Sequence, residues 1–272
     1  MSNRVPAPLG VFDSGVGGLT LVKAIWQRAP QTPVLFLADT AHVPYGDRPP
    51  EEIRQFAMAI ARWLAAQGCS AIAMGCNLSS SVALQAVEGA LSIPVFGLIA
   101  PAAQVAARAT HGGVVGVIAT QGTVSSGSYQ HAISQASPEV EVVAVAAPRL
   151  VPLVERGELD SPEAREALAG YLAPLLEAGA DTIVYGCTHY PWLARLASEL
   201  AGPTVTFVDP AQVMADLLPL PTGPGPAASK CKLLEAVATG SGESVAAFAQ
   251  RFLGLPDLQV RHVPFEEIAK EG

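Results

Sequence analysis

Five short apolar runs recur along the chain, and each ends at a small or polar residue. They are rich in Val, Ile, Leu and Ala and span residues 9–12, 34–38, 71–74, 114–119 and 182–185. Continuous rather than alternating hydrophobicity is typical of strands that are buried on both faces, as in a parallel sheet. Strands separated by helical segments predict an α/β fold with mostly parallel sheets flanked by helices.

Two of the intervening segments show clear helical signals. Residues 51–67 place Ile53, Phe56, Ile60, Trp63 and Leu64 on one stripe. Residues 161–178 begin with Ser-Pro-Glu, which is a capping residue followed by proline at the first helical position. We therefore expect helices over both ranges.

The sequence also resembles itself. Residues 68–77 can be laid over residues 179–188, because each stretch begins with glycine, runs through an apolar strand and ends in Gly-Cys plus a small polar residue. A second pair sets residues 10–14 against residues 116–120 in the same order. The repeats predict two similar α/β domains that face each other.

We expect the first domain to comprise residues 1–100 plus 211–272, and the second to comprise residues 101–210. Residues 219–226 read PLPTGPGP, a composition typical of a surface linker. We interpret the following segment, 230–253, as one or two helices that return to the first domain.

Composition excludes several classes of partner. The formal net charge is −8 and the chain has no basic run, so we expect neither nucleic acid nor an anionic membrane surface as a partner. Two charge-free stretches, 69–87 and 89–107, are interrupted by polar residues or by proline and glycine, so neither is a continuous membrane span. Residues 1–8 lack the apolar region of a signal peptide, and we expect a cytoplasmic protein.

The four cysteines form no CxxC pair and no zinc-ligand pattern. We expect free thiols and no metal. Cys69 and Cys231 are interpreted as buried packing residues. Cys76 and Cys187 differ from them, because each follows a glycine at the end of an apolar run.

Ligands bind at the carboxyl ends of strands in open parallel sheets. Here those ends carry two thiols, several hydroxyls, an amide and few fixed charges, from Asp13, Ser14, Cys76, Asn77, Thr120, Thr123, Cys187, Thr188 and His189. Two thiols at equivalent ends of repeated halves suggest a pair acting on opposite faces of one carbon. Racemisation needs this symmetry, because one group removes a proton and the other returns one. A free cysteine has a pKa of about 8.5, which suits both tasks.

The runs GVFDSGVGGLT (10–20), ADTAHVPYG (38–46), GCN (75–77), GVIATQGTV (116–124) and YGCTHYP (185–191) resemble those of glutamate racemases. The resemblance covers residues 10–209, with the motifs in family order. It implies two α/β domains related by pseudo-twofold symmetry, with the active site between them and neither pyridoxal phosphate nor metal. It also implies interconversion of L- and D-glutamate, which supplies D-glutamate for bacterial peptidoglycan, and a possible homodimer.

The resemblance also implies a role for each matching residue. Cys76 and Cys187 become the two acid/base groups, with Asp13 beside Cys76 and His189 beside Cys187. Glu155 is a further candidate on the side of Cys187. The substrate is expected to be held by hydroxyl, amide and backbone groups of Ser14, Pro44, Tyr45, Gly46, Asn77, Leu78, Thr120, Thr123 and Thr188, together with Asp13 and His189.

Leu78 departs from the family, which commonly has threonine at this position. The backbone N–H remains but a hydroxyl is lost. One hydrogen bond to a charged group is worth about 1.5 to 3 kcal/mol, so the departure bears on affinity for the substrate. Ser79 is a possible replacement.

Several of these residues also have simpler interpretations. Asp13 could cap the next helix, and the glycines at 15, 17 and 18 match neither the dinucleotide fingerprint nor the lysine-containing phosphate loop. Tyr45 could be a core aromatic residue, although a Pro-Tyr-Gly turn is better placed to meet a ligand. We expect the other four histidines to be exposed, namely His42, His111, His131 and His262.

Two alternative functions stay open at this point. The same fold could act on aspartate or a hydantoin, although such relatives usually lack the DSGVGG and PYG runs together. A binding protein without catalysis is the second alternative, and Leu78 is its only indication.

Overall fold

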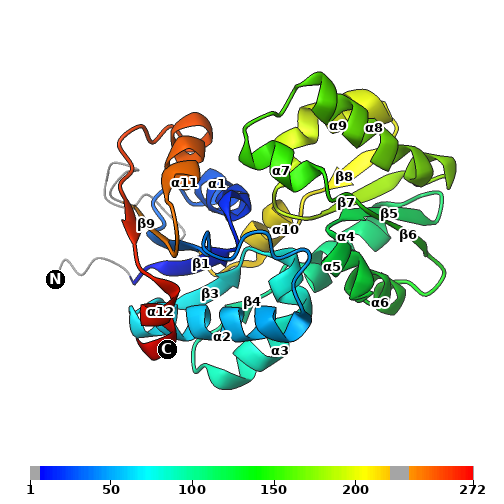
Figure 1. The fold of residues 1–272 in the computed structure, drawn as a ribbon. Helices are drawn as coiled ribbons and strands as arrows, with labels where there is room; N and C mark the ends of the chain where they lie inside the picture. The colour runs from blue at the N-terminus through cyan, green and yellow to red at the C-terminus, as the bar shows by residue number, and fades with distance from the viewer. Residues whose placement is uncertain (1–6, 221–232, 272) are drawn as a thin grey trace.

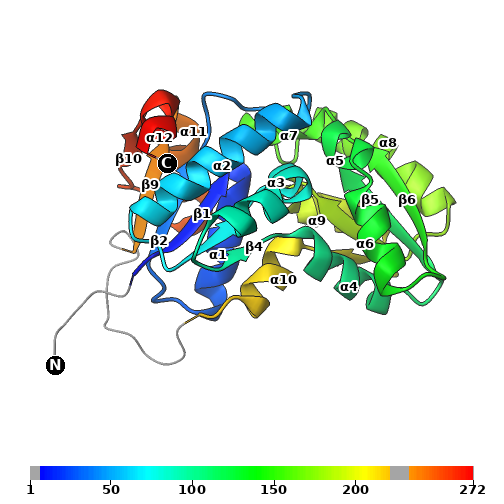
Figure 2. The same cartoon turned by 90° about the horizontal axis from the view of Figure 1, so that it is seen from below.

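The computed structural model describes residues 7–220 and 233–271, and their strands form two separate sheets. Figure 1 shows the sheets in two lobes. The first lobe contains the elements between residues 9 and 96 and between 234 and 271, and the second contains those between 99 and 208. Helix α10 (Pro210–Leu217) lies between the lobes, as Figure 2 shows from below.

The elements of the first lobe follow the strand–helix alternation expected from the sequence. In chain order they are β1 (Leu9–Asp13), η1 (Val16–Gly18), α1 (Leu19–Arg28), β2 (Val34–Ala38), α2 (Pro50–Ala66), β3 (Ala71–Met74), α3 (Asn77–Ala90), β4 (Val95–Phe96), β9 (Leu234–Ala238), α11 (Glu243–Phe248), the π-helical turn η4 (Ala249–Leu253), β10 (Val260–His262) and α12 (Phe265–Glu271).

The second lobe repeats the alternation. Its elements are α4 (Ile99–Ala109), β5 (Val114–Ala119), α5 (Gln121–Ser125), α6 (Ser128–Ala136), β6 (Glu141–Ala146), α7 (Leu150–Glu155), α8 (Pro162–Glu177), β7 (Thr182–Gly186), η2 (Tyr190–Leu193), α9 (Ala194–Ala201) and β8 (Thr206–Val208). Helix α8 is capped as expected, because the Ala164 N–H donates to the Ser161 hydroxyl and Pro162 opens the helix.

The two sheets share one strand order. The second sheet runs β6-β5-β7-β8, and the first contains β2-β1-β3-β4 in the corresponding order, extended beyond β2 by β9 and β10. All pairings among the described strands are parallel. Cys76 therefore follows β3 and Cys187 follows β7, at equivalent places. Both repeats begin at a glycine with φ of 83°, Gly68 and Gly179, where a side chain would strain the backbone.

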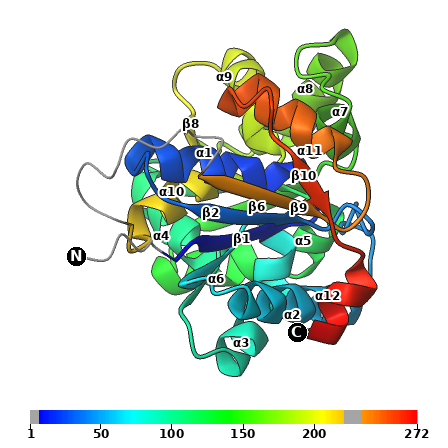
Figure 3. The same ribbon diagram turned by 90° about the vertical axis from the view of Figure 1, so that its left-hand side faces the viewer.

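Helices cover both faces of each sheet. Figure 3 shows α1 and α11 on one side of the first sheet and α2 and α12 on the other. In the second sheet, buried residues of α8 and α9 pack on one face, and those of α4 and α6 pack on the other. The core that includes α1, α10 and α11 is continuous with that of α8 and α9. The α/β prediction, with mostly parallel sheets, is confirmed.

One expected segment is wrong in part. Residues 234–238 form strand β9, which pairs with β2 along its whole length, whereas the sequence suggested helices from 230 to 253. Its Leu-Glu-Ala-Val-Ala composition suits a helix, but the open edge of β2 selects the extended form. Cys231 and residues 221–226 of the expected linker lie outside the described residues. The domain boundaries stay a prediction. Within 7–220 and 233–271, every helix is too short or too polar to cross a bilayer.

Candidate active site

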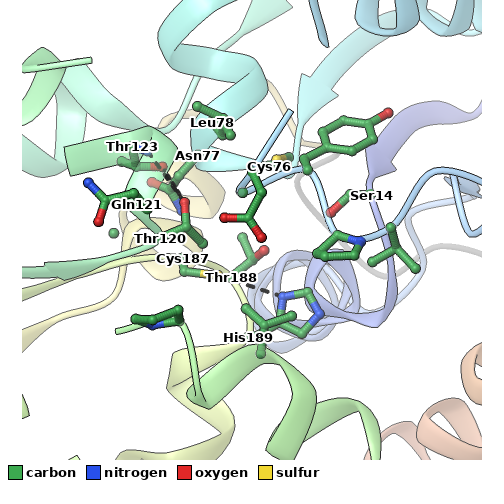
Figure 4. A pocket seen from close by; sticks show the side chains of 18 of the residues that line it. Ser14, Cys76, Asn77, Leu78, Thr120, Gln121, Thr123, Cys187, Thr188 and His189 are labelled. Carbon is green, nitrogen blue, oxygen red and sulfur yellow. Dashed lines mark hydrogen bonds between the residues drawn. The ribbon is translucent and has the colours of Figure 1, made fainter. Parts of the chain in front are cut away.

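One pocket of about 110 Å³ takes its lining from both lobes. Figure 4 shows its side chains from close by. Cys76 and Cys187 both line it, so the two thiols share one cavity. The other expected residues in the lining are Ser14, Pro44, Tyr45, Gly46, Asn77, Leu78, Thr120, Thr123, Thr188 and His189. Asp13 and Glu155 are not part of the lining and contact residues that are.

Cys76 is the residue that precedes the first turn of α3, and its side chain is buried. The Ser79 N–H donates to Cys76 Sγ at 3.5 Å. Burial, followed by the negative charge of Asp13, raises the pKa of the Cys76 thiol to about 12, although hydrogen bonds from Ser79 act in the opposite direction. Cys76 therefore holds its proton at neutral pH.

Cys187 is attached to a chain of polar groups on the other side of the pocket. His189 Nδ1 lies 3.7 Å from Cys187 Sγ, and His189 Nε2 lies 2.7 Å from Glu155 Oε1. Burial alone would lower the pKa of His189, but its hydrogen bonds to Cys187 and Glu155 raise that pKa well above the usual value. The pKa of Glu155 is lowered, because the hydrogen bond and charge of His189 outweigh the effect of burial. These contacts favour the protonated form of the His189 imidazole, within reach of the sulfur.

Asp13 links the two lobes. Its Oδ1 accepts the Gly15 N–H at 2.9 Å, and its Oδ2 accepts the Thr188 hydroxyl at 2.8 Å. The carboxyl is 1% exposed, and this burial raises its pKa even though the charge of His189 opposes the shift. Asp13 thus makes a local turn with Gly15 and also holds a pocket residue of the other lobe. It is not the helix cap that the simpler interpretation expected, because neither η1 nor α1 has a side-chain cap hydrogen bond.

The glycine run that follows Asp13 serves contact between the lobes. A Cβ atom on Gly15 would lie 2.6 Å from Glu155 Oε1, and one on Gly17 would lie 2.7 Å from His189 Nδ1. The Val16 N–H also donates to Glu155 at 3.3 Å. Only glycine lets the backbone approach the His189–Glu155 pair this closely. This contact explains the glycines without a nucleotide-binding loop.

The Pro44-Tyr45-Gly46 turn is held by a buried carboxylate, Asp39. The Tyr45 hydroxyl donates to Asp39 at 2.5 Å, and the Thr239 hydroxyl of the segment after β9 donates to it at 2.6 Å. His42 Nδ1 lies 2.9 Å from the same group, and its ring stacks on Phe56. The expectation that His42 is exposed is therefore wrong, because its side chain is 23% exposed and has partners on two sides.

Leu78 is buried and packs across the lobes. A Cβ atom on Gly122 would lie 2.8 Å from Leu78 Cδ2, so the leucine lies directly against the backbone of α5. Ser79, the suggested replacement for a lost hydroxyl, is 0% exposed and does not belong to the pocket lining. The structure therefore gives no support to compensation by Ser79.

Several lining residues were not expected from the sequence. Asp47 and Gln121 add polar groups, and the rest of the additional lining is apolar or backbone, from Val43, Pro148, Val151, Pro152 and Gly186. Asp47 directly follows the motif at 38–46 and Gln121 lies within the motif at 116–124, so their position was the available signal. Pro148, Val151 and Pro152 belong to a loop and helix that no motif marked. In the described part of the chain, no three His, Cys, Asp or Glu side chains are grouped as a metal ion would require.

Comparison with known proteins places the chain in a family. The family model for Asp/Glu/hydantoin racemase matches residues 19–218. A glutamate racemase from Gloeobacter violaceus is 49% identical over 203 residues, which is 75% of this chain and 76% of that protein. The crystal structure of a glutamate racemase isoform from Bacillus anthracis has a TM-score of 0.87 at 32% identity, covering 96% of this chain and 98% of that one.

A second solved structure is that of glutamate racemase from Francisella tularensis in complex with D-glutamate. Its TM-score is 0.85 at 27% identity, and it covers 96% of this chain and 98% of that one. These similarities extend over both lobes and the pocket that they share. The chain therefore belongs to the Asp/Glu/hydantoin racemase family and, within it, groups with the glutamate racemases.

Proposed function

We propose that the chain interconverts L- and D-glutamate without a cofactor, by proton transfer to and from two thiols. The observation that carries the proposal is that Cys76 and Cys187, from equivalent strand ends of the two lobes, line one small pocket. The names of the relatives support glutamate as substrate. D-glutamate in the complex from Francisella tularensis is further support.

The proposed step places the substrate's α-carbon between the two sulfurs. The thiolate of one cysteine removes the α-proton from its own side, and the thiol of the other gives its proton to the opposite face. The configuration at carbon inverts, and the two sulfurs exchange protonation states. Cys76, whose raised pKa keeps its thiol protonated, gives that proton when Cys187 acts as the base. His189 exchanges a proton with Cys187, and Glu155 keeps the imidazole protonated.

Neutral donors hold the carboxylates in this proposal. The backbone N–H groups at the start of α3 favour an anion next to Cys76. Thr120 and Thr123 face each other on the second lobe with their hydroxyl oxygens 3.0 Å apart, and Thr188 is fixed by Asp13. The donors of this pocket are hydroxyl and amide groups instead of a lysine or arginine. Such neutral donors suit an anionic substrate that must be bound and then released.

Incubation with L-glutamate in heavy water tests this function. Deuterium should enter the α-position as D-glutamate appears. Exchange with aspartate or a hydantoin but not with glutamate would reassign the substrate, and no exchange with any of them would indicate a binding protein without catalysis. The assay reports the reaction and the substrate together.

The cellular setting is a proposal of the same kind. We propose that the product D-glutamate supplies peptidoglycan synthesis and that the protein works in the cytoplasm. The three described cysteines, all free thiols, support a reducing compartment. A homodimer stays a prediction from the family, and light scattering of the purified protein tests it.

A further inference from the structure

Asn77 has a buried hydrogen-bond donor without a partner, beside the pocket. It is the first residue of α3, directly after Cys76, and it belongs to the lining. The side chain is 2% exposed, and among the described residues its Nδ2 has no hydrogen-bond partner. Figure 4 shows Asn77 and Thr123 on the side of the pocket away from His189. A buried amide N–H without a partner costs free energy unless a ligand satisfies it.

The other end of this amide is fixed from the second lobe. The hydroxyl of Tyr129, in α6, donates to Asn77 Oδ1 at 2.6 Å. Tyr129 is 1% exposed and does not belong to the pocket lining. Burial, together with the charges of Asp209 and Cys187, raises the pKa of Tyr129 well above its usual value. The phenol therefore stays protonated and remains a donor throughout the range in which proteins work.

This bond selects one of the two orientations of the amide. A side-chain amide has one oxygen that accepts and one nitrogen that donates. If the amide were turned over, the Tyr129 hydroxyl would face an NH₂ group instead of an acceptor. Among the described residues, this hydroxyl donates to no other acceptor. With the oxygen on Tyr129, the NH₂ group is the part left for a ligand.

We propose that Tyr129 is a positioning residue for substrate binding. Its hydroxyl holds the Asn77 oxygen, so that Asn77 Nδ2 donates to a carboxylate of the substrate beside Cys76. The inference rests on the proposed function, because it assumes an anionic amino acid in the pocket. Tyr129 touches neither sulfur nor substrate, so its effect is on affinity rather than on proton transfer.

Tyr129→Phe tests the assignment, because it removes the hydroxyl and keeps the ring. We expect KM to rise about tenfold for both enantiomers, the loss that corresponds to about 1.4 kcal/mol of binding. We expect kcat to change less than about threefold and the pH profile to keep its shape, since neither Tyr129 nor Asn77 titrates in the working range. Tyr185→Phe is the matched control, since it removes a buried hydroxyl of the same lobe that has no partner among the described residues and lies outside the lining.

The double variant decides whether Tyr129 acts through Asn77. In an Asn77→Ala background, Tyr129→Phe should add nothing to KM, because the amide it positions is gone. A further rise in that background, or an unchanged KM in Tyr129→Phe alone, overturns the inference.

Asn77→Asp covers the case in which Tyr129→Phe fails to fold. It keeps an acceptor for Tyr129 and replaces the donor by a carboxylate, so KM should rise at least as much. An unchanged KM for Asn77→Asp overturns the inference. If the unchanged protein shows no exchange with glutamate in heavy water, the proposed function itself fails, which distinguishes the two outcomes.

Discussion

The two halves of the pocket have the same backbone arrangement, but different side chains lie behind their two sulfur atoms. Cys76 and Cys187 follow corresponding strands of two sheets with the same order. In the repeat, Leu78 corresponds to His189, and Asp13 corresponds to Ala119. The first sulfur therefore has a carboxylate nearby and an apolar side chain two residues later. The second has an imidazole two residues later, with Glu155 behind it.

The position of each sulfur and its protonation depend on different residues. The repeated strands bring each sulfur to the same pocket, whereas the residues that break the repeat give the two sulfurs different charged neighbours. Burial and Asp13 keep the proton on Cys76, and the His189–Glu155 pair supplies a proton donor to Cys187. A reaction that inverts one carbon needs similar geometry on both sides but opposite protonation states.

The largest expected effect comes from removing either sulfur. Cys76→Ser and Cys187→Ser should each lower racemisation by about 10²- to 10⁴-fold, the usual contribution of one acid/base group, since a hydroxyl is a far weaker acid than a thiol. Circular dichroism of the glutamate pool measures the rate. Cys69→Ser, a buried cysteine outside the lining, should leave it unchanged. Substantial turnover in either active-site variant would refute the two-thiol mechanism.

Glu155→Gln acts mainly on the side of Cys187, through His189. It removes the charge that helps to raise the pKa of His189, so the imidazole loses its proton at lower pH. Activity that needs protonated His189 is lost as pH rises through that pKa. The alkaline limb of the kcat/KM profile should therefore move to lower pH, and kcat should fall roughly 10- to 100-fold, less than for loss of a whole acid/base group.

The control for this change is Glu158→Gln. Glu158 is an acid nearby in sequence that pairs with Arg156 at the surface. Glu158→Gln should leave the pH profile of kcat/KM unaltered. An alkaline limb that stays in place in Glu155→Gln would mean that Glu155 does not set the protonation of His189.

Asp13→Asn changes the charge beside Cys76 and also alters the group that accepts the Thr188 hydroxyl. Without the carboxylate, the pKa of Cys76 should fall from about 12, while burial keeps it above the usual value. Each unit of decrease raises the thiolate fraction about tenfold below the pKa, but the thiolate also becomes a weaker nucleophile, so iodoacetamide should alkylate Cys76 about threefold faster per unit. Cys69 is an internal control, because burial and Glu235 rather than Asp13 raise its pKa. Equal acceleration at both cysteines would point to a loosened fold.

The sequence predicted what depends on local pattern. The apolar runs located β1, β2, β3, β5 and β7 to within a residue, because strands buried on both faces are continuously hydrophobic. It could not locate contacts between distant segments. Glu155 meets Val16 across 139 residues, and Thr239 meets Asp39 across 200, and no local pattern marks either pair. Strand β9 was missed for the same reason, since the edge of β2 that it joins lies far away in sequence.

Leu78→Thr makes the smallest expected change and tests the position that corresponds to His189. A threonine hydroxyl could donate to the substrate, which alone would lower KM about tenfold. The leucine, however, packs directly against Gly122 of the other lobe. Loss of this contact should lower the free energy of unfolding by about 1 to 2 kcal/mol. Because the contact also holds the two lobes of the pocket together, its loss should offset part of the gain in affinity. We therefore expect a several-fold decrease in KM with a lower Tm. A KM that stays the same or rises would show that Leu78 contributes to binding by holding the lobes together, and that its departure from the family is already accommodated.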